Sequence, residues 1–228
     1  MTDLSLNFLV VVPARAGSKR LKNKNRLKVG GRTLFERVKE IVADLGLLES
    51  TVVSTDDPTL ACHAKSLGFN VPGLRPPELS TDTATTTSVV QHALSLNNSV
   101  GCVKPDFILL LQPTSPFRNA KTIRRAINCL SANPKISAVT SGSLSFERSF
   151  KTLTDIYDIE IENPDGSQAP YVDANGNFYL VRYKNFLETS SFFPKLTKVF
   201  IGSVEEAIDI DEFADLLKAR SIARKMKI

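Results

Sequence analysis

A dense cationic segment is the first part of the sequence that could do chemistry. Residues 15–32 hold eight Lys or Arg and no acid, whereas residues 33–215 hold 16 bases and 23 acids. The segment opens with Arg15-Ala16-Gly17-Ser18, whose small side chains leave backbone amides open to phosphate oxygens, while arginine and lysine neutralise phosphate charge. It is neither a Walker loop (GxxxxGK[ST]) nor a dinucleotide-binding GxGxxG loop. The pattern predicts a phosphate site.

The alternative for this segment is a solvated basic loop or a nucleic-acid patch. Platforms that stack bases interleave aromatic residues with basic ones, and residues 14–34 contain no aromatic residue. The segment also follows an apolar run typical of a buried strand, where α/β sheets bind ligands. These features favour a small phosphorylated ligand. Residues 216–228 add five more bases, and the pattern gives them no role.

The second segment is LLLQPTSPFR at residues 109–118. Pro113 and Pro116 fix an extended, rigid exit from a strand, and the Gln112 amide offers donors and an acceptor to a polar ligand. The alternative is the start of a helix capped by Thr114 or Ser115. The segment alone does not decide between them.

The third segment is a pair of acids near the C-terminus. Ile208 and Ile210 alternate with Asp209 and Asp211, so an extended backbone places both carboxylates on one face. Two hard oxygen donors suit Mg2+, which binds a few carboxylates together with water and substrate phosphates. The alternative is that Asp211 caps the following helix and Asp209 lies at the surface.

Alternating strands and helices position these segments. Apolar runs predict strands at 7–13, 51–55, 107–112 and 136–141, and helical spacing predicts helices that begin after Thr33 or span 58–67, 86–96 and 120–131. Thr33 and Glu36 fit a capping box. This order indicates an α/β fold with a doubly wound, mostly parallel sheet. Arg15, Asp56, Gln112 and Thr114 would then lie beyond the carboxyl ends of strands.

The alternation of strands and helices is interrupted over residues 143–205. Residues 163–166 read as a turn, and FYLVRY and KVFIG read as strands, so we expect an antiparallel excursion there. An amphipathic helix follows at 212–225. We expect one domain over residues 1–228, with 143–205 as this excursion.

Composition excludes several classes of protein. No run reaches the about 18 apolar residues of a membrane helix, and the N-terminal segment has an acid but no base before its apolar run, unlike a secretory signal. The three cysteines have no CxxC spacing and only two histidines accompany them, so neither a disulfide framework nor a zinc site is expected. These features predict a cytoplasmic protein that does not bind membranes.

Four segments taken in order resemble one family: ARAGSKRLKNKN, RPPELSTDTATT, LLLQPTSPFR and AIDID. They look like the CMP-nonulosonate synthetases, the acylneuraminate cytidylyltransferase family, and the resemblance runs from Val10 to Leu216. It implies a Rossmann-like nucleotidyltransferase fold and transfer of CMP from CTP to the anomeric hydroxyl of a nonulosonic acid of sialic, legionaminic or pseudaminic type, with release of pyrophosphate. It also implies Mg2+ dependence and a homodimer formed through the excursion, with no nucleic-acid partner.

The resemblance also implies roles for individual residues. Catalysis would fall to Arg15, Lys24, Asp209 and Asp211, of which the two aspartates would bind the metal. The nucleotide would be bound by Arg15, Ala16, Gly17, Ser18, Lys19, Lys24, Asn25, Arg75, Ser80, Thr81, Asp82 and Thr83. The sugar would be bound by Gln112, Thr114, Asn175 and Tyr179.

Two positions depart from the family's pattern. Lys22 stands where many members have a proline, and Asp173 stands where the sialic-acid members have an arginine. An arginine binds a carboxylate and an aspartate repels one, so a legionaminic or pseudaminic sugar is favoured over sialic acid. Arg148, Lys151 or Arg182 could supply the missing charge.

Two other functions stay open at this point. One is CMP activation of an eight-carbon acidic sugar or another sugar. The other is nucleic-acid binding through the basic loop.

Overall fold

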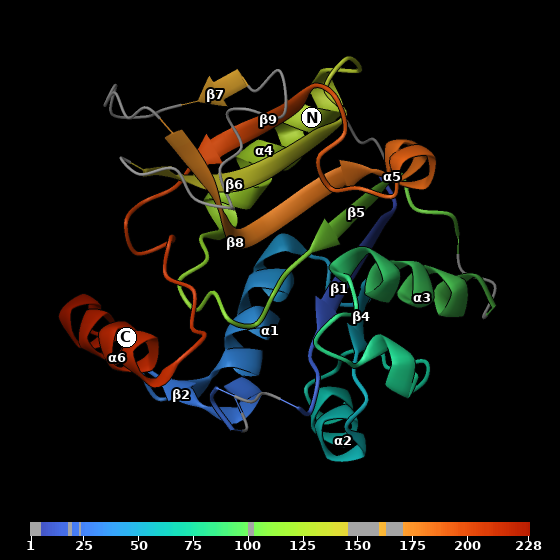
Figure 1. Cartoon of the computed structure of the whole chain (residues 1–228). Helices are drawn as coiled ribbons and strands as arrows, with labels where there is room; N and C mark the ends of the chain where they lie inside the picture. The colour runs from blue at the N-terminus through green and yellow to red at the C-terminus, as the bar shows by residue number, and fades with distance from the viewer. Residues whose placement is uncertain (1–5, 18–19, 23, 100–102, 146–159, 163–170) are drawn as a thin grey trace.

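A seven-stranded sheet forms the centre of the computed structural model, which describes residues 6–17, 20–22, 24–99, 103–145, 160–162 and 171–228 (Figure 1). The strands lie in the order β4-β1-β5-β8-β6-β9-β7. Their bounds are β1 Phe8–Pro13, β4 Thr51–Ser54, β5 Phe107–Leu110, β6 Ala138–Ser145, β7 Glu160–Glu162, β8 Tyr171–Arg182 and β9 Thr197–Ile201.

Strand direction confirms the predicted mostly parallel sheet. β1 pairs in parallel with β4 and β5, while β6 and β7 each pair in parallel with β9. β8 runs antiparallel to both of its neighbours, β5 and β6. The described strands of residues 143–205 therefore join the main sheet, and among them only β8 reverses direction. The predicted turn at 163–166 lies outside the described residues.

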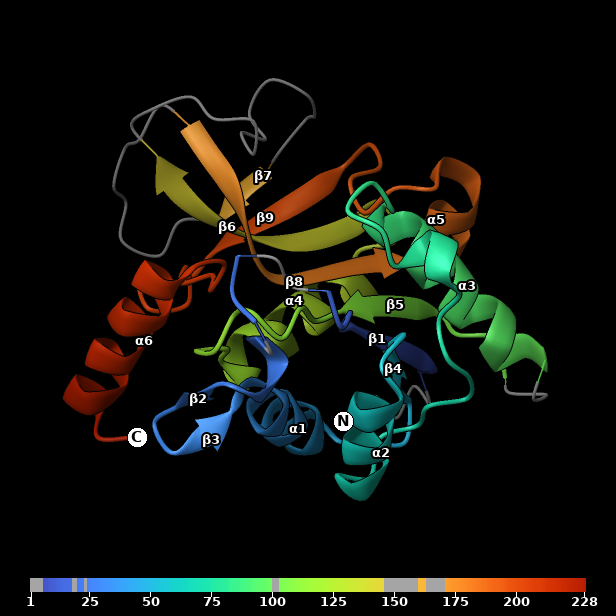
Figure 2. The ribbon, with the colours of Figure 1, turned by 60° about the horizontal axis from the view of Figure 1, so that its bottom comes forward.

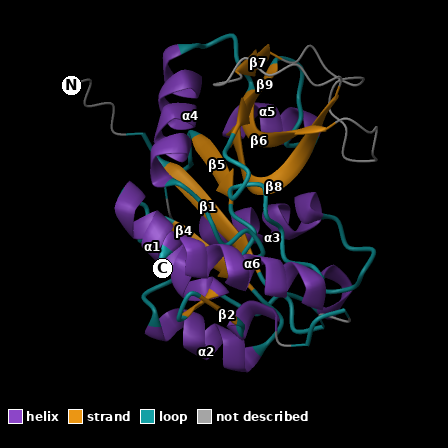
Figure 3. Ribbon diagram, turned by 90° about the vertical axis from the view of Figure 1, so that its left-hand side faces the viewer, coloured by secondary structure: helices purple, strands orange, loops and turns teal. Residues whose placement is uncertain are grey.

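Side-chain alternation along β1 separates two core layers. Val10 and Val12 pack against helices α1 (Leu34–Leu45), α2 (Pro58–Ser66) and α4 (Ala120–Ala132), whereas Leu9 and Val11 pack against α3 (Thr86–Ser99) and α5 (Tyr183–Thr189). Figure 3 shows α1 and α4 on one side of the strands and α3 and α5 on the other. The sheet is thus buried on both faces, as its continuous apolar strands predict.

A third cluster joins the C-terminal helix to the segment that follows β1. Helix α6 (Phe213–Met226) packs with Ile208 and Ile210 against Val29 of the hairpin formed by β2 (Lys28–Val29) and β3 (Arg32–Thr33). Figure 2 shows α6 beside this hairpin. The Nε of Arg220 on α6 donates to the Lys28 carbonyl at 3.1 Å.

The basic residues near the C-terminus have a structural explanation. Arg224 and Lys225 lie in the last turn of α6, where positive charge interacts favourably with the helix dipole. At the start of α1, Thr33 and Glu36 form the predicted capping box. Among the described helices none is long and apolar enough to cross a membrane.

Candidate active site

Polar residues follow the carboxyl ends of three adjacent strands. Arg15 comes after β1, Asp56 after β4 and Gln112 after β5. These strands are parallel, so the three residues share one edge of the sheet, where ligands bind in α/β folds. This is the arrangement that the sequence pattern predicts.

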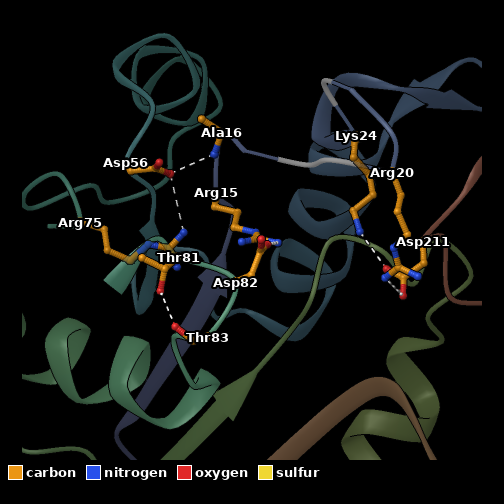
Figure 4. Close-up of polar contacts among 10 residues, drawn as sticks. All are labelled: Arg15, Ala16, Arg20, Lys24, Asp56, Arg75, Thr81, Asp82, Thr83 and Asp211. Atoms are coloured by element: carbon orange, nitrogen blue, oxygen red, sulfur yellow. Dashed lines mark hydrogen bonds and ion pairs between the residues drawn. The ribbon is translucent and has the colours of Figure 1, made fainter. Parts of the chain in front are cut away.

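Asp56 organises the part of the site nearest β4 (Figure 4). Its Oδ1 accepts from the Ala16 backbone N–H at 2.9 Å and lies 3.7 Å from Nη2 of Arg75. The Arg75 side chain is only 4% exposed, and burial lowers its pKa, with Arg15 lowering it further and Asp56 opposing. The sequence placed Asp56 at this edge but did not identify it as the residue that joins Ala16 to Arg75.

Arg75 also connects strand β4 to the following loop. Its backbone N–H donates to the Thr55 carbonyl at 2.7 Å, and its Nε donates to the Ser80 hydroxyl at 3.2 Å. The short helix η2 (Pro77–Leu79) lies between Arg75 and Ser80. Ser80 therefore holds one edge of the Arg75 guanidinium, whereas its buried Nη2 has no hydrogen-bond partner among the described residues.

The loop after η2 approaches the first strand through an ion pair. Asp82 Oδ1 lies 2.6 Å from Nη2 of Arg15, and the hydroxyls of Thr81 and Thr83 are 3.1 Å apart. Arg15 and Asp82 are both partly exposed, so an anionic ligand that reaches Arg15 would compete with Asp82 for it.

Asp211 gathers two cations of the basic loop. Its Oδ1 lies 3.0 Å from Lys24 Nζ and its Oδ2 2.9 Å from Arg20 Nη2. Burial alone raises the pKa of the Asp211 carboxyl, but the bonds to Lys24 and Arg20 outweigh burial and lower it below its usual value. Asp211 is therefore ionised at neutral pH.

Helix α6 is capped by other residues than Asp211. Asp215 Oδ2 accepts from the backbone N–H groups of Asp211 and Glu212, each at 2.9 Å, and Glu212 and Asp215 form a capping box. The Asp211 side chain is thus free of the capping role that was the alternative for it. Likewise Asn119 caps α4, so Thr114 and Ser115 are not caps either.

A bulge in β8 forms the wall of the site next to Gln112. The β6–β8 register shifts so that residues 175–178 stand opposite Ser141, a local insertion that bends the strand. Gly176 has φ +77°, and a Cβ there would lie 3.1 Å from Gln112 Oε1 and 3.8 Å from Asp209 Oδ2. Gly176, Gln112 and Asp209 therefore converge on one place.

Asparagine side chains hold the bulge in shape. Asn175 Nδ2 donates to the Ser143 hydroxyl at 3.1 Å, and its Oδ1 accepts from the Asn177 N–H at 3.1 Å. Asn177 Nδ2 donates to the Glu206 carbonyl at 2.8 Å. Both asparagines are buried, so the bulge is a built feature of the strand.

The predicted sugar-side residues Thr114 and Tyr179 have different surroundings. The Thr114 carbonyl accepts from the Ile210 N–H at 2.9 Å, which joins the segment after β5 to the aspartate pair. Tyr179 packs on Phe192 and Phe193, and burial, followed by the negative charge of Asp209, raises its pKa to about 12.

The remaining predicted nucleotide residues have the following places. Asn25 is buried in the short helix η1 (Lys24–Arg26), and its Nδ2 lies 3.4 Å from the Arg15 carbonyl. Gly17 is exposed, with open space where a side chain would stand. Ser18 and Lys19 lie outside the described residues, as do Arg148 and Lys151.

Arg182 was a wrong candidate for reading a sugar carboxylate. Its guanidinium donates to the carbonyls of Leu130, Ile136 and Asn133, at and beyond the C-terminal end of α4. Arg182 also pairs with Phe107 at the start of β5, the sheet edge opposite Gln112. A single arginine in a strand does not reveal which edge it reaches.

His92 on α3 is half-buried beside Arg75. Its Nδ1 is buried and has no hydrogen-bond partner within the described part of the chain. Burial lowers the pKa of His92, Arg75 lowers it further and Glu78 opposes. Nothing in the sequence pattern distinguished it from an exposed helical histidine.

The aspartate pair fits a Mg2+ ion that is completed by substrate. Across the described residues no group of three or more His, Cys, Asp or Glu forms a metal cage. Mg2+ needs no such cage, since it commonly takes one or two carboxylates and fills its shell with water and phosphate oxygens. Asp209 and Asp211 supply donors of that kind, and Asp211 is held ionised.

Comparisons with known proteins agree on one family. The sequence profile described as cytidylyltransferase matches residues 9–217. A CMP-N,N'-diacetyllegionaminic acid synthase of Legionella pneumophila is 35% identical, covering 90% of this chain and 91% of that protein. A pseudaminic acid cytidylyltransferase of Campylobacter jejuni is 29% identical, covering 91% and 92%.

A third relative and one solved structure are also similar to this chain. An N-acylneuraminate cytidylyltransferase of Escherichia coli is 29% identical over 96% of this chain, which spans 52% of that protein's length. A CMP:2-keto-3-deoxy-manno-octonic acid synthetase complexed with CTP superposes with a TM-score of 0.67 at 17% identity, covering 96% of this chain and 99% of that one. At that identity the superposition shows the fold alone.

Replacing Gly176 tests the convergence at the bulge. Gly176→Ala should lower the free energy of unfolding by about 2 kcal/mol, because it combines a positive φ with a contact to Gln112. Urea unfolding measures the loss. Gly31→Ala is the control, since Gly31 has φ +78° and open space around its Cβ. Equal losses in the two variants would contradict the contact with Gln112.

The environment of His92 predicts a pH dependence of stability. Its pKa is lowered in the folded chain, so the unfolded chain takes up a proton first as the pH falls through about 6.5. The free energy of unfolding should therefore decline below that pH, and His92→Gln should reduce the decline. Chemical unfolding at a series of pH values measures it. His63→Gln, which replaces the chain's other histidine, should retain the wild-type dependence.

Proposed function

Because the chain belongs to the cytidylyltransferase family, we propose that it transfers CMP from CTP to the anomeric hydroxyl of a nonulosonic acid, releasing pyrophosphate. One observation carries the proposal. Two groups of side chains lie next to each other along the same edge of the sheet. One is cationic and consists of Arg15, Lys24 and Arg75; the other is polar and consists of Gln112 and Asp209. A highly charged nucleotide and a polar acceptor need such a pair of adjoining sites.

The cationic group would bind CTP. Arg15 and Lys24 would hold the triphosphate, together with the backbone amide of Gly17 and with Ser18 and Lys19; the Ala16 N–H instead ties the loop to Asp56. Arg75 and residues 80–83 would surround the cytosine and ribose, with Asn25 near the nucleotide. Support comes from Arg75, whose buried guanidinium is bonded to Ser80 through Nε and lies beside Asp56, with a buried Nη2 that has no hydrogen-bond partner among the described residues.

The reaction would be an in-line displacement at the α-phosphorus. The anomeric hydroxyl oxygen forms a bond to the α-phosphorus and loses its proton to water, while the bond from the α-phosphorus to the oxygen shared with the β-phosphate breaks and pyrophosphate leaves. The work of the protein is mainly to position the reactants and offset charge. Arg15 and Lys24 would stabilise the leaving pyrophosphate. Gln112 would orient the sugar, with Thr114, Asn175 and Tyr179 around it.

Asp209 and Asp211 would hold Mg2+ at the junction of the two groups. When bound, the ion neutralises phosphate charge and increases the acidity of a coordinated hydroxyl. The contribution of the chain is to present the two carboxylates. Ile208 and Ile210 fix their backbone by burial, and Lys24 and Arg20 keep Asp211 ionised.

The position of Asp173 supports a sugar of legionaminic or pseudaminic type. Asp173 pairs with Ser143 and lies two residues from Asn175, so all three share one face of the sheet. A carboxylate there accepts from the N–H of an acylamino group, of which an N,N'-diacetylated sugar carries two. The 35% identity to a CMP-N,N'-diacetyllegionaminic acid synthase points in the same direction.

The homodimeric state and the cytoplasmic location belong to the same proposal. The four matching segments and the likeness to whole-length relatives support it. Sedimentation velocity of the purified chain would measure the oligomeric state, and a monomer at micromolar concentration would contradict the dimer.

A substrate panel tests the function. The purified chain with Mg2+ would be incubated with CTP, ATP, GTP or UTP and with N,N'-diacetyllegionaminic, pseudaminic, N-acetylneuraminic or an eight-carbon acidic sugar. We expect pyrophosphate release and a CMP-sugar mass only with CTP, fastest with a diacetylated nine-carbon acid. Turnover confined to the eight-carbon sugar would select that alternative. Salt-sensitive binding to any duplex without turnover would select the nucleic-acid alternative.

Replacing one metal-side carboxylate gives a sharper prediction. Asp209→Asn should lower kcat by about 100-fold or more, because a neutral amide binds Mg2+ more weakly than a carboxylate and the phosphate charge of the transition state is then less well offset. The unfolding midpoint should stay near that of the wild type. Asp44→Asn, at an exposed position of α1, is the control. Near-wild-type turnover of Asp209→Asn with Mg2+ supplied would refute the role of Asp209.

A further inference from the structure

Arg118 occupies the junction between two walls of the proposed acceptor site. It ends the segment that follows β5, directly before the Asn119 cap of α4, and the residue is only 9% exposed. Its Nη1 donates to the Ser115 carbonyl at 2.8 Å, and its Nη2 donates to the Gln112 carbonyl. Its Nε donates to the Asn177 carbonyl in the β8 bulge at 2.6 Å.

These three bonds connect segments that are distant in the sequence. Gln112 and Ser115 belong to the exit from β5, whereas Asn177 lies 59 residues beyond Arg118. Gln112 and Gly176 face each other within contact distance, so the guanidinium links the backbones on both sides of that contact. A planar group with five N–H donors in a fixed fork can hold such a geometry.

Burying a cation here is costly if stability alone is considered. Burial lowers the pKa of Arg118 to about 9, although the nearby negative charge of Asp209 raises it. The group is still protonated at neutral pH. An apolar residue of similar size commonly serves stability at least as well as a buried charge. The bonding partners of Arg118 therefore indicate a role in geometry.

We propose that Arg118 is the positioning residue of the acceptor-sugar site. It fixes the backbone of Gln112 against the Gly176–Asn177 bulge, so that the Gln112 amide is aimed before the sugar arrives. This inference rests on the proposed function, because the proposed function assigns the acidic sugar to the group around Gln112. Arg118 acts through these neighbours and does not itself contact the reacting atoms.

The chain contains a matched control for this role. Arg182 also directs its guanidinium to three backbone carbonyls, those of Leu130, Ile136 and Asn133, but at the opposite edge of the sheet. Arg118→Lys and Arg182→Lys each keep the positive charge and lose the planar fork. A purely structural role would make the two variants alike.

The first experiment needs no substrate. Hydrogen exchange followed by mass spectrometry should be about tenfold faster in Arg118→Lys over residues 112–118 and 175–178, because the bonds of a charged donor are lost. Peptides over 15–17 and 75–83 should exchange as in the wild type. Arg182→Lys should speed exchange near 133–136 instead. Unchanged exchange at 112–118 and 175–178, or equal acceleration everywhere, would overturn the proposal.

The second experiment separates the two substrates. Arg118→Lys should raise the KM for the acidic sugar about tenfold, while its Kd for CTP, measured by calorimetry without sugar, stays within about twofold of the wild type. Arg182→Lys should change neither constant. Parallel loss of CTP binding and sugar use would overturn the positioning role. If the wild type activates no acidic sugar, the proposed function fails, and the exchange experiment alone decides the role of Arg118.

A measurement on the wild-type protein covers the case in which Arg118→Lys does not fold. The Nε–H resonance of Arg118 should exchange slowly with solvent and should shift when the acidic sugar is added, but not when CTP alone is added. Rapid exchange of this proton, or a shift with CTP alone, would overturn the proposal.

Discussion

The site depends on one buried cation that bridges two segments. Arg118 donates to carbonyls before and after a turn at the end of β5 and to a carbonyl in the β8 bulge. The Ile210 N–H bonds to the Thr114 carbonyl, so the segment that carries Asp209 is tied to the same place. Three parts of the chain that are far apart in sequence therefore meet in a single geometry. Loss of the guanidinium would leave these carbonyls without that donor, at a cost in stability.

The direction of β8 makes that junction possible. Because β8 runs antiparallel beside β5, its residue Tyr179 pairs with Leu110, at the carboxyl end of β5. The residues just before Tyr179 must then lie beyond the end of β5, beside the segment that starts at Gln112. The bulge at 175–178 increases the reach of the backbone there, and Gly176 permits it through a positive φ. The antiparallel pairing of β8 thus both completes the sheet and places the bulge beside Gln112.

Much of the fold could be predicted from the sequence because its signals are local. Apolar runs revealed β1 and β5, and Thr33 with Glu36 revealed the start of α1. The antiparallel direction of β8 was predicted, but its place between β5 and β6 and the burial of Arg118 could not be, since neither periodicity nor composition states which distant segment is the partner. For the same reason Arg182 was wrongly considered for the site, and Asp56 and His92 received no role. Small residues, positive charge and the spacing of carboxylates identified the segments of the site in the sequence. Only the pairing of strands shows which of these segments lie next to one another.

The cationic loop also has a different character in the structure than in the sequence. Its eight bases would repel one another if they were gathered without counterions. Instead Asp82 pairs with Arg15, Asp56 lies beside Arg75, and Asp211 binds Lys24 and Arg20. These acids come from three separate segments, and each aligns a cation at the sheet edge. Partly exposed ion pairs contribute little stability, so a ligand with several negative charges can replace Asp82 at Arg15 at small cost. The acids therefore arrange the cations for a polyphosphate without binding them too strongly to release.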